Sequence, residues 1–295
     1  MRLKPSAFSY RRPTSVNEVF SLLREYAGDA KIIAGGQSLV PAMNLRLATP
    51  KMLVDLGGIP ALSELRVSES GYLYAGAMVT HGRFLSDPLV LRDWPMIGKV
   101  LPHVAHEAIR TRGTLGGSLC HGDPAAEWPA LCMLLDARMT LCGLEGKREV
   151  AAHEFSLGVY ETAVREGELL EKVCFPPFDT EWRWGCCEVS RRQGDFALAG
   201  AMVGLRLRGG VLIDARLVVF GVEDKPRRMD AELSHLLGQP PSISGFSRAG
   251  LFAAMNVSPR ADLHASADFR QDLVIVCVER ALWDAAGTEF SGVAR

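Results

Sequence analysis

The sequence predicts an α+β protein, and three patterns carry this prediction. An amphipathic helix at 16–28 precedes a short apolar strand, "KIIA" at 31–34, which runs into two glycines. Residues 61–175 mix hairpin patterns with helical ones. Two long apolar stretches then flank Arg208-Gly209-Gly210, and further helices follow them. Strands and helices are therefore combined in each part of the chain.

Size and charge limit the classes of function. The 295 residues suffice for two or three packed units, and a net charge of −1 creates no field that would attract a polyanion. We therefore expect no nucleic-acid partner. The N-terminal stretch "MRLKPSAFSYRRP" lacks the apolar core of a secretory signal, and no apolar run reaches about 18 residues. We expect a soluble cytoplasmic protein without a membrane span.

The seven cysteines are scattered, and none of them belongs to a C-x-x-C pair. This usage favours reduced thiols and fits no iron–sulfur or zinc template. An organic cofactor would therefore have to carry any redox chemistry. The neighbours Cys186 and Cys187 predict a strand with one thiol on each face.

The first unit is expected at 1–60. Ser15 and Glu18 form a capping-box pattern ahead of an apolar stripe that ends near Gly28. The strand "KIIA", a glycine turn, the helical stretch "LVPAMNLR" and a second strand, "KMLVDLG", complete a small α/β unit.

The second unit is expected at 61–177 and the third at 178–295, with Pro176-Pro177 as the boundary. In the second unit we expect a hairpin about 69–71, helices at 81–87 and 96–109, a hairpin from "ARMTLCG" and "KREVAA", and a closing strand, "GELLEKVCFP". In the third unit we expect the hairpin about 208–210 and helices at 229–238, 247–255 and 266–286.

Two glycine-rich motifs are the main candidates for ligand binding. The first motif is "AGGQS" at 34–38 and the second is "TLGGS" at 114–118, and each precedes a helical stretch. Consecutive glycines let backbone N–H groups converge on an anion, and Ser38, Thr114 and Ser118 add hydroxyl groups. Two such motifs that meet in space could clamp a diphosphate. Neither matches G-x-G-x-x-G or G-x-x-x-x-G-K-[ST], which disfavours Rossmann and P-loop sites, although each could be a plain tight turn.

Two polar stretches are open to more than one interpretation. Asp123 before Pro124 is typical of a helix start, with Asp123 as the N-cap, and Glu127 could accept from sugar hydroxyls or favour the helix dipole. In "SRRQGDFALAG", Arg191, Arg192 and Asp195 fit a surface ion-pair cluster. Phe196 in the same stretch could belong to the core or lie against a planar ligand.

The histidines do not indicate a metal site or a catalytic site. His103 and His106 are one helical turn apart, but no third ligand stands at metal-site spacing, so we expect no metal site. No Ser-His-Asp or Cys-His set can be inferred, because "GGSLC" lacks the nucleophile-elbow pattern.

Beyond these patterns, the chain resembles a known family almost from end to end. The strings "AGGQSLVPAMNLRLATP", "AGAMVTHGRF", "IRTRGTLGGSLCHGDPAAEWPA", "SRRQGDFALAG", "GVEDKPRR" and "DLHASADFR" occur in the order expected for the FAD-binding medium subunit of the molybdenum hydroxylases. This family includes xanthine dehydrogenase and carbon monoxide dehydrogenase. The resemblance implies a vanillyl-alcohol-oxidase (PCMH)-type fold of two α+β subdomains that hold FAD, followed by a C-terminal domain with a three-stranded sheet and helices.

The resemblance also implies roles for particular residues. The two motifs would bind the FAD diphosphate, and their residues are Ala34, Gly35, Gly36, Gln37, Ser38, Thr114, Leu115, Gly116, Gly117 and Ser118. Ile33 and Leu39, which flank the first motif, would also belong to the cofactor site. Asp123 and Glu127 would contact sugar or ribityl hydroxyls, and Leu169 and Leu170 would lie near the flavin. Phe196 would cover one face of the isoalloxazine ring.

One position departs from the family pattern. Several members carry a lysine near the flavin, two residues before "SRR", where this chain has Glu188. An anion in place of a cation would disfavour an anionic reduced flavin and alter the choice of electron acceptor.

The resemblance implies an electron-transfer subunit. FAD in this chain would take electrons from iron–sulfur clusters on a small subunit, and the molybdenum cofactor would sit on a large subunit. The three chains would form a heterotrimer or a dimer of heterotrimers, and an external acceptor would receive the electrons. The alternatives are a stand-alone flavin-dependent oxidase or dehydrogenase on the same scaffold, and a non-redox dinucleotide-binding protein.

Overall fold

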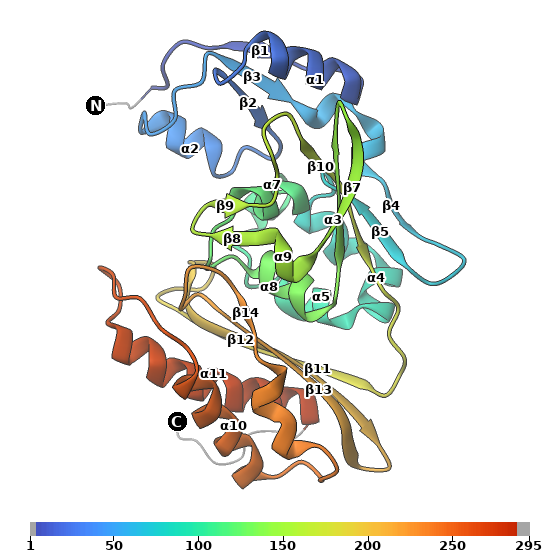
Figure 1. The fold of residues 1–295 in the computed structure, drawn as a ribbon, viewed down its shortest axis with the longest axis vertical. Coiled ribbons are helices and arrows are strands. Elements are labelled where there is room, and N and C mark those ends of the chain that lie inside the picture. Colours follow the sequence, from blue (N-terminus) through green and yellow to red (C-terminus); the bar gives the residue numbers. More distant parts are fainter. Residues whose placement is uncertain (1–3, 288–295) are drawn as a thin grey trace.

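The computed structural model describes residues 4–287, and these residues form three sheets of three or more strands that follow one another along the long axis of the molecule, besides one two-stranded sheet (Figure 1). The strands of each sheet come from one continuous stretch of the chain. The sheets of the first unit, the middle unit and the C-terminal unit lie in chain order from one end of the molecule to the other. The unit boundaries at 60 and 177 remain predictions.

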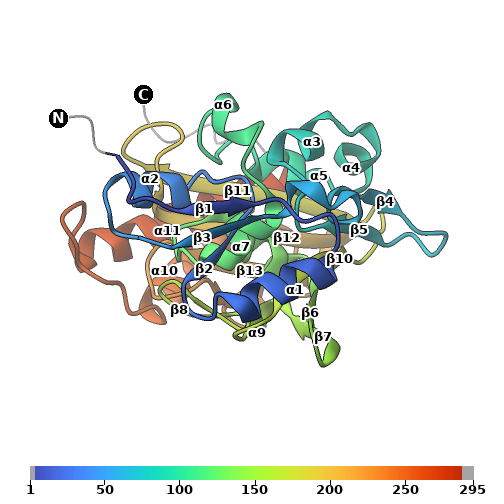
Figure 2. The same cartoon turned by 90° about the horizontal axis from the view of Figure 1, so that it is seen from above.

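The first unit is a three-stranded parallel sheet in the order β1-β3-β2, with one helix before β2 and another after it. Its elements are β1 (Ser9–Arg11), α1 (Val16–Glu25), β2 (Ala30–Ile33), α2 (Leu39–Asn44) and β3 (Met52–Asp55). In Figure 2 the molecule is seen from the end that carries these strands.

The predicted capping box at the start of α1 is present in a modified form. The Ser15 hydroxyl accepts from the Glu18 N–H at 3.3 Å, and the Glu18 carboxylate accepts from the Thr14 N–H at 2.9 Å. The carboxylate thus reaches one residue further back than in the standard box. The helix ends at Glu25, a little earlier than the Gly28 that we expected.

The middle unit is a five-stranded sheet in the order β4-β5-β10-β6-β7, all neighbours antiparallel. The strand expected to close this unit is its central strand, β10. The strands are β4 (Leu65–Val67), β5 (Leu73–Gly76), β6 (Arg138–Gly143), β7 (Gly146–Ala151) and β10 (Leu169–Phe175), beside the small hairpin β8 (Ser156–Gly158) and β9 (Glu161–Thr162).

Short helices connect these strands. They are η1 (Leu56–Gly58), η2 (Pro60–Ser63), α3 (His81–Ser86), α4 (Pro88–Asp93), α5 (Pro95–Val100), α6 (Glu107–Arg110), α7 (Leu115–His121), α8 (Glu127–Leu134) and α9 (Ala152–Phe155). The single helix predicted at 96–109 is wrong. The chain leaves the helix after α5, and Ala105 has a φ of +46°, which interrupts helical geometry before α6.

The C-terminal unit is a sheet in the order β11-β12-β13-β14 with two long helices on one face (Figure 1). Its elements are β11 (Trp182–Ser190), β12 (Ala197–Arg208), β13 (Val211–Phe220), β14 (Arg227–Arg228), η3 (Asp230–Leu236), α10 (Ile243–Met255) and α11 (Ala267–Ala286). The three long strands match the expected sheet, and β14 adds a two-residue edge. The helix predicted at 229–238 is a 3₁₀ helix, η3.

The C-terminal sheet is buried on both faces. One face packs with α10 and α11, and the other packs on the helices of the middle unit through Trp184, Met202 and Phe220. Cys186 contacts the core of the middle unit and Cys187 contacts the core of the C-terminal unit. The prediction that these two thiols lie on opposite faces of a strand is confirmed.

Within residues 4–287, no helix is long and apolar enough to cross a bilayer.

Candidate functional site

The first glycine motif forms the loop between β2 and α2. Gly36 has a φ of +72°, which glycine adopts without steric cost, and the Gln37 side-chain amide donates to the Gly35 carbonyl at 2.9 Å. Among the described residues, the backbone N–H groups of Gly35, Gly36, Gln37 and Ser38 donate to no protein acceptor. The loop is half-buried from Ile33 to Gln37. A run of unpaired N–H groups around a left-handed glycine is the chemistry of an anion site.

The second motif is the first turn of α7, and not the open glycine loop that the sequence indicated. The Thr114 hydroxyl caps the helix by accepting from the Gly117 N–H at 3.0 Å. The Leu115 and Gly116 N–H groups donate to the carbonyls of Val79 and Ala77 at 2.9 and 2.8 Å. These amides are thus engaged within the protein, so the second motif does not present the free amides that the first motif does.

The glycines of the second motif serve close packing instead. A Cβ on Gly116 would stand 2.5 Å from the Cβ of Ala77, and a Cβ on Gly117 would stand 2.8 Å from the Thr114 hydroxyl. A larger side chain at either glycine would clash with these atoms, so glycine is what allows α7 to pack this close to the end of β5.

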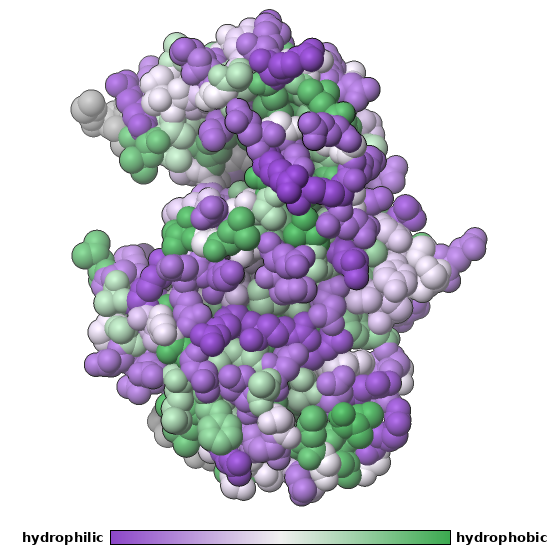
Figure 3. Space-filling view, in the orientation of Figure 1, coloured by the Kyte–Doolittle hydropathy of each residue, from purple (hydrophilic) through white to green (hydrophobic). Residues whose placement is uncertain are grey.

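The two motifs touch each other. A Cβ on Gly35 would stand 2.2 Å from the Arg112 carbonyl oxygen, and a Cβ on Gly117 would stand 3.5 Å from the Cβ of Ala34. The condition for a clamp, that the two motifs meet in space, is therefore met. Figure 3 shows a notch in the surface between the first unit, on the side of α2, and the middle unit. The ligand of this region stays a prediction.

Asp123 lies in the turn that follows α7, and the prediction that it caps the next helix is wrong. The N-cap of α8 is Ala126, and the Asp123 carboxylate instead accepts from the Ala125 N–H at 2.9 Å, two residues on. Pro124 belongs to the same turn. The Tyr160 hydroxyl donates to the other Asp123 oxygen at 3.3 Å, so the hairpin β8-β9 covers this carboxylate.

Glu127 is the first residue of α8, and its carboxyl group is buried. Burial raises the pKa of Glu127 to about 7; its own backbone N–H lowers the pKa, and the charge of Asp123 raises it. The position in the first turn agrees with the interpretation that Glu127 favours the helix dipole. The alternative, that the Glu127 carboxyl group accepts from a sugar hydroxyl, stays a prediction.

Glu188 is a second buried carboxyl group, on β11. Its side chain is 2% exposed, and one carboxylate oxygen, Oε2, has no hydrogen-bond partner among the described residues. That oxygen lies 4.0 Å from His103 Nδ1. Burial, the charge of Glu127 and the thiol of Cys187 raise the pKa of Glu188 to about 8. The raised pKa favours the neutral form of the Glu188 carboxyl group, which softens its contrast with lysine.

The remaining candidates fall into two groups. Leu169 and Leu170 open β10 and are 2% exposed; Leu169 packs with the core of the first unit and Leu170 with that of the middle unit. Phe196, in contrast, is 59% exposed at the end of the loop before β12. The alternative that Phe196 is a core residue is therefore excluded. Leu39 is half-buried as the first residue of α2.

The ion-pair cluster predicted in "SRRQGDFALAG" is absent from the described residues. Arg191 contacts His264 Nδ1 at 3.3 Å, and the Asp195 backbone N–H closes a turn onto the Arg192 carbonyl. The six residues 191–196 therefore form a tight loop between β11 and β12, and Arg191 in this loop reaches the C-terminal segment at His264.

His81 supports the second motif and was not singled out from the sequence. Its backbone N–H donates to the Gly113 carbonyl at 3.0 Å, and its Nδ1 accepts from Trp128 Nε1 at 2.9 Å. Burial, assisted by the charge of Arg110, lowers the pKa of His81 to about 4, so the ring is neutral. The ring also lies against Gly113, where a Cβ would stand 2.8 Å from it.

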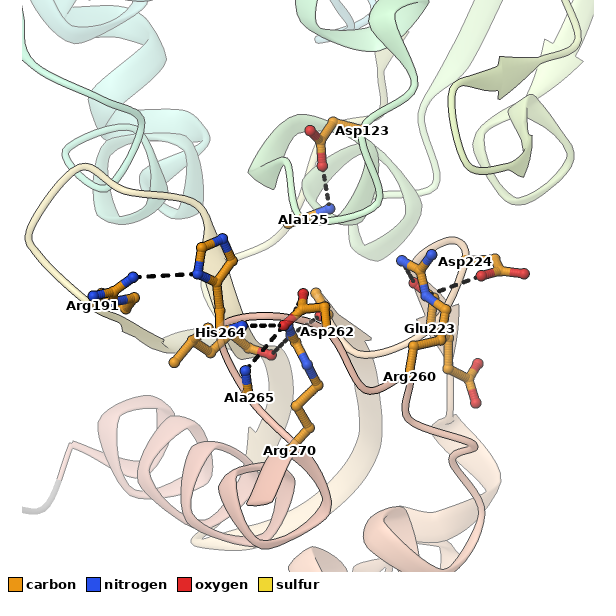
Figure 4. A network of polar contacts seen from close by, with 12 residues as sticks. Asp123, Ala125, Arg191, Glu223, Asp224, Arg260, Asp262, His264, Ala265 and Arg270 are labelled. Atoms are coloured by element: carbon orange, nitrogen blue, oxygen red, sulfur yellow. Dashed lines mark hydrogen bonds and ion pairs between the residues drawn. The ribbon is translucent and has the colours of Figure 1, made fainter. Parts of the chain in front are cut away.

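A polar network in the C-terminal unit faces the turn of Asp123 (Figure 4). The buried Arg270 donates to the Gly221 carbonyl at 2.7 Å and to Asp262 at 2.6 Å, and it also donates to the Leu198 carbonyl. Asp262 in turn accepts from the His264 N–H at 2.8 Å. Arg270 thus anchors the 262–265 loop. In the sequence, this network was indicated only by the strings "GVEDKPRR" and "DLHASADFR", which contributed to the family resemblance.

Arg260 holds the neighbouring part of the same network. Its guanidinium pairs with Asp224 at 3.0 Å and donates to the Glu223 carbonyl at 3.2 Å (Figure 4). The Gly221 N–H donates to the Pro124 carbonyl at 3.1 Å, which ties the C-terminal sheet to the turn of Asp123.

Comparisons with known proteins cover nearly the whole chain. Residues 6–178 match the family model described as the FAD binding domain in molybdopterin dehydrogenase, and residues 186–285 match the CO dehydrogenase flavoprotein C-terminal domain. The chain is 36% identical to the nicotine 6-hydroxylase medium subunit of Paenarthrobacter nicotinovorans, over 96% of this chain and 99% of that subunit.

Solved structures agree with this match. A chain of quinoline 2-oxidoreductase from Pseudomonas putida 86 has a TM-score of 0.92 and 41% identity, over 96% of this chain and 98% of that chain. A chain of the carbon monoxide dehydrogenase of Hydrogenophaga pseudoflava, in a form that lacks the Mo-pyranopterin moiety, has the same TM-score, 34% identity and the same coverage.

Proposed function

Since this chain belongs to the family of FAD-binding medium subunits of molybdenum hydroxylases, we propose that the meeting point of its two glycine motifs holds the diphosphate of FAD. The observation that carries this proposal is the row of unpaired N–H groups from Gly35 to Ser38, pressed against the N-terminal end of α7. These donors suit a diphosphate that no lysine or arginine of the motif neutralises.

The other candidate residues fit a molecule that extends from this point. Asp123 and Glu127 lie in the turn and helix that follow α7, where their oxygens could accept from hydroxyl groups of the cofactor. Phe196 offers an exposed aromatic ring for stacking, and Leu169 and Leu170 supply apolar surface at the start of β10. Bound FAD would supply one- and two-electron redox chemistry at this site.

The protein is a subunit of an oxidoreductase complex, and its own residues serve to bind and insulate the cofactor. We propose that a small iron–sulfur subunit delivers electrons to the FAD and that a large molybdenum subunit oxidises the organic substrate. The three chains would form a heterotrimer, or a dimer of heterotrimers, in the cytoplasm. An external acceptor would receive the electrons. No group of three or more potential metal ligands occurs within residues 4–287.

Purification of the chain alone, and then with its two partner subunits, tests the proposal. We expect flavin absorbance that dithionite bleaches, no oxidation of substrate by the chain alone, and turnover in the full complex. If the purified chain bound a dinucleotide but showed no flavin absorbance band, the proposal that its cofactor is FAD would be wrong. Substrate oxidation by the isolated chain at the rate of the complex would show a stand-alone enzyme.

A further inference from the structure

The loop at 191–196 presents Phe196 at one of its ends. Inside the loop, the backbone closes a single turn at the Arg192 carbonyl. At the end nearer β11, Arg191 contacts His264 Nδ1 at 3.3 Å (Figure 4). Phe196, at the end nearer β12, is 59% exposed. The place of its ring therefore depends on whatever supports this second half of the loop.

Gly194 is the point at which the second half of the loop rests on the middle unit. Its φ is +86°, and a Cβ there would stand 3.0 Å from the carbonyl carbon and oxygen of Ala105. The same Cβ would stand 3.1 Å from His106 Cε1. These distances are tighter than ordinary side-chain contacts, so the loop lies directly on the backbone of the turn between α5 and α6. A shift of that turn would move Gly194, and Phe196 two residues later would move with it.

Arg110 holds the turn on which Gly194 rests. It is the last residue of α6 and is half-buried, and its Nη1 donates to the Ala105 carbonyl at 2.7 Å. The same nitrogen donates to the carbonyls of Val104 and Pro102 at 3.0 and 3.4 Å. Ala105 needs this support, because its φ of +46° lies in a region that alanine rarely adopts. The carbonyl that accepts the shortest of these bonds is also the one that faces Gly194.

The segment that contains this turn also reaches the first glycine motif. The carbonyl of Arg112, two residues after Arg110, is the group against which Gly35 packs. The short segment 102–112 thus contacts both the loop proposed to hold the diphosphate and the loop that carries Phe196. It is a brace between the two ends of the proposed cofactor site.

Since the proposed function places Phe196 against the isoalloxazine ring, we propose that Arg110 is a positioning residue for the flavin. Arg110 fixes the turn at 102–106, the turn supports Gly194, and Gly194 sets where the Phe196 ring lies. The guanidinium acts on the turn and not on FAD itself. Loss of Arg110 should therefore release the ring from the flavin and leave the backbone donors of the first glycine motif in place.

A fluorescent reporter at position 196 tests this role. Indole is an electron donor that quenches flavin fluorescence when the two rings are in contact, so Phe196→Trp converts the position of the ring into a signal. The fluorescence of bound flavin is measured in the FAD-loaded full chain with and without Phe196→Trp. The five native tryptophans act on both proteins and cancel in the ratio. We expect Phe196→Trp to lower the fluorescence at least about threefold.

The same ratio is then measured with the turn disturbed from either side. Arg110→Met keeps the aliphatic stem and removes the donors, and quenching by Phe196→Trp should fall below about 1.5-fold in this background. Arg110→Lys keeps a cationic donor at the same place and should restore most of the quenching. Gly194→Ala leaves Arg110 intact but presses a Cβ against the Ala105 carbonyl, and it should abolish the quenching as Arg110→Met does.

Arg216→Met is the matched control for a general loss of stability. Arg216 is also half-buried and donates to a backbone carbonyl, that of Leu134, at 3.1 Å, and its guanidinium covers the ring of Trp182. The variant should lower the melting temperature and leave the quenching by Phe196→Trp unchanged. This comparison separates a weakened fold from a displaced ring.

FAD content is measured first in every variant. Undiminished quenching in Arg110→Met, or in Gly194→Ala if Arg110→Met cannot be loaded with FAD, would overturn the positioning role. An FAD-loaded Phe196→Trp chain without any quenching would show that the side chain at 196 does not lie on the flavin. That result would also end this inference, and the proposal of an FAD site would remain. An unmodified chain that never takes up FAD would instead refute the proposed function itself.

Discussion

Gly35 lies against the backbone of Arg112 so closely that a Cβ would stand 2.2 Å from the arginine carbonyl oxygen. The absence of a side chain at this one position therefore allows the first glycine motif to reach the segment that leads into the second. We expect Gly35→Ala to force the two motifs apart and to weaken FAD binding about tenfold or more, which corresponds to about 1.4 kcal/mol. Flavin content after purification, and titration of the stripped protein with FAD, measure the loss.

Gly82→Ala is the control for this substitution. Gly82 in α3 also faces a backbone carbonyl, that of Arg110, but a Cβ would lie at an ordinary contact distance of 3.4 Å. The variant should bind FAD normally and gain about 0.5–1 kcal/mol from the better helix propensity of alanine. Equal flavin content in both variants would show that the contact at Gly35 is not needed for the site.

Thr114 caps α7, and its removal should cost stability as well as cofactor. Because the Thr114 hydroxyl accepts from the Gly117 N–H, Thr114→Ala should lower the free energy of unfolding by about 1 kcal/mol. Thr114→Ser keeps the acceptor and should stay close to the wild type. Urea unfolding of the two variants, with flavin content followed in parallel, makes the comparison. A Thr114→Ser variant as unstable as Thr114→Ala would assign the effect to the lost methyl group.

The buried acid Glu188 should make the protein less stable as the pH rises. Its folded pKa of about 8 lies above the ordinary value for glutamate, so the folded state binds the extra proton. The stability is therefore complete below about pH 4 and is lost progressively as the pH rises to about 8. Glu188→Gln should be closest to the wild type near pH 4 and should exceed it at pH 9 by a few kcal/mol, at about 1.4 kcal/mol per pKa unit. The melting temperatures of the variant and the wild type are measured at both pH values. The same difference in melting temperature at the two pH values would contradict this prediction.

Removal of the Arg270 side chain should lower the free energy of unfolding strongly. It is 5% exposed and donates to two backbone carbonyls and to Asp262, so Arg270→Ala leaves these acceptors without a partner. We expect a loss of about 3 kcal/mol or more. Arg248→Ala serves as the control, since Arg248 is exposed and only covers the ring of Phe252; it should cost about 0.5–1 kcal/mol. Denaturant unfolding gives both values, and equal costs would contradict the anchoring role.

Patterns that depend on neighbours in the chain were predictable from the sequence. The cap of α1 at Ser15, the hairpin at 208–210 and the two faces of β11 at Cys186 and Cys187 all follow from local rules that need no tertiary information. The strand of Cys186 and Cys187 shows the limit of such rules. Its alternation predicts two faces, but not that both faces are buried.

Features that depend on distant parts of the chain could not be predicted in this way. Asp123 before Pro124 has the pattern of a helix start, yet Tyr160, brought in by the hairpin β8-β9, holds its carboxylate in a turn. Nothing in the sequence indicated that the backbone N–H groups of Leu115 and Gly116 are hydrogen-bonded. Their acceptors, the carbonyls of Val79 and Ala77, belong to a much earlier segment of the chain. Glu188 on β11 and His103, 85 residues earlier, likewise come within 4.0 Å of each other only through the tertiary fold.

The central place of β10 sets an order of events during synthesis of the protein. The register of the middle sheet joins Gly76 of β5 to Lys172 of β10, so β5 has to wait for a strand that is made much later. Both glycine motifs leave the ribosome before β10 does, and Leu169 of β10 belongs to the core that supports the first unit. The nascent chain can therefore complete the middle sheet only after residue 175, the end of β10, has been synthesised. Cofactor loading would in this sense have to wait for β10, although both glycine motifs are made earlier.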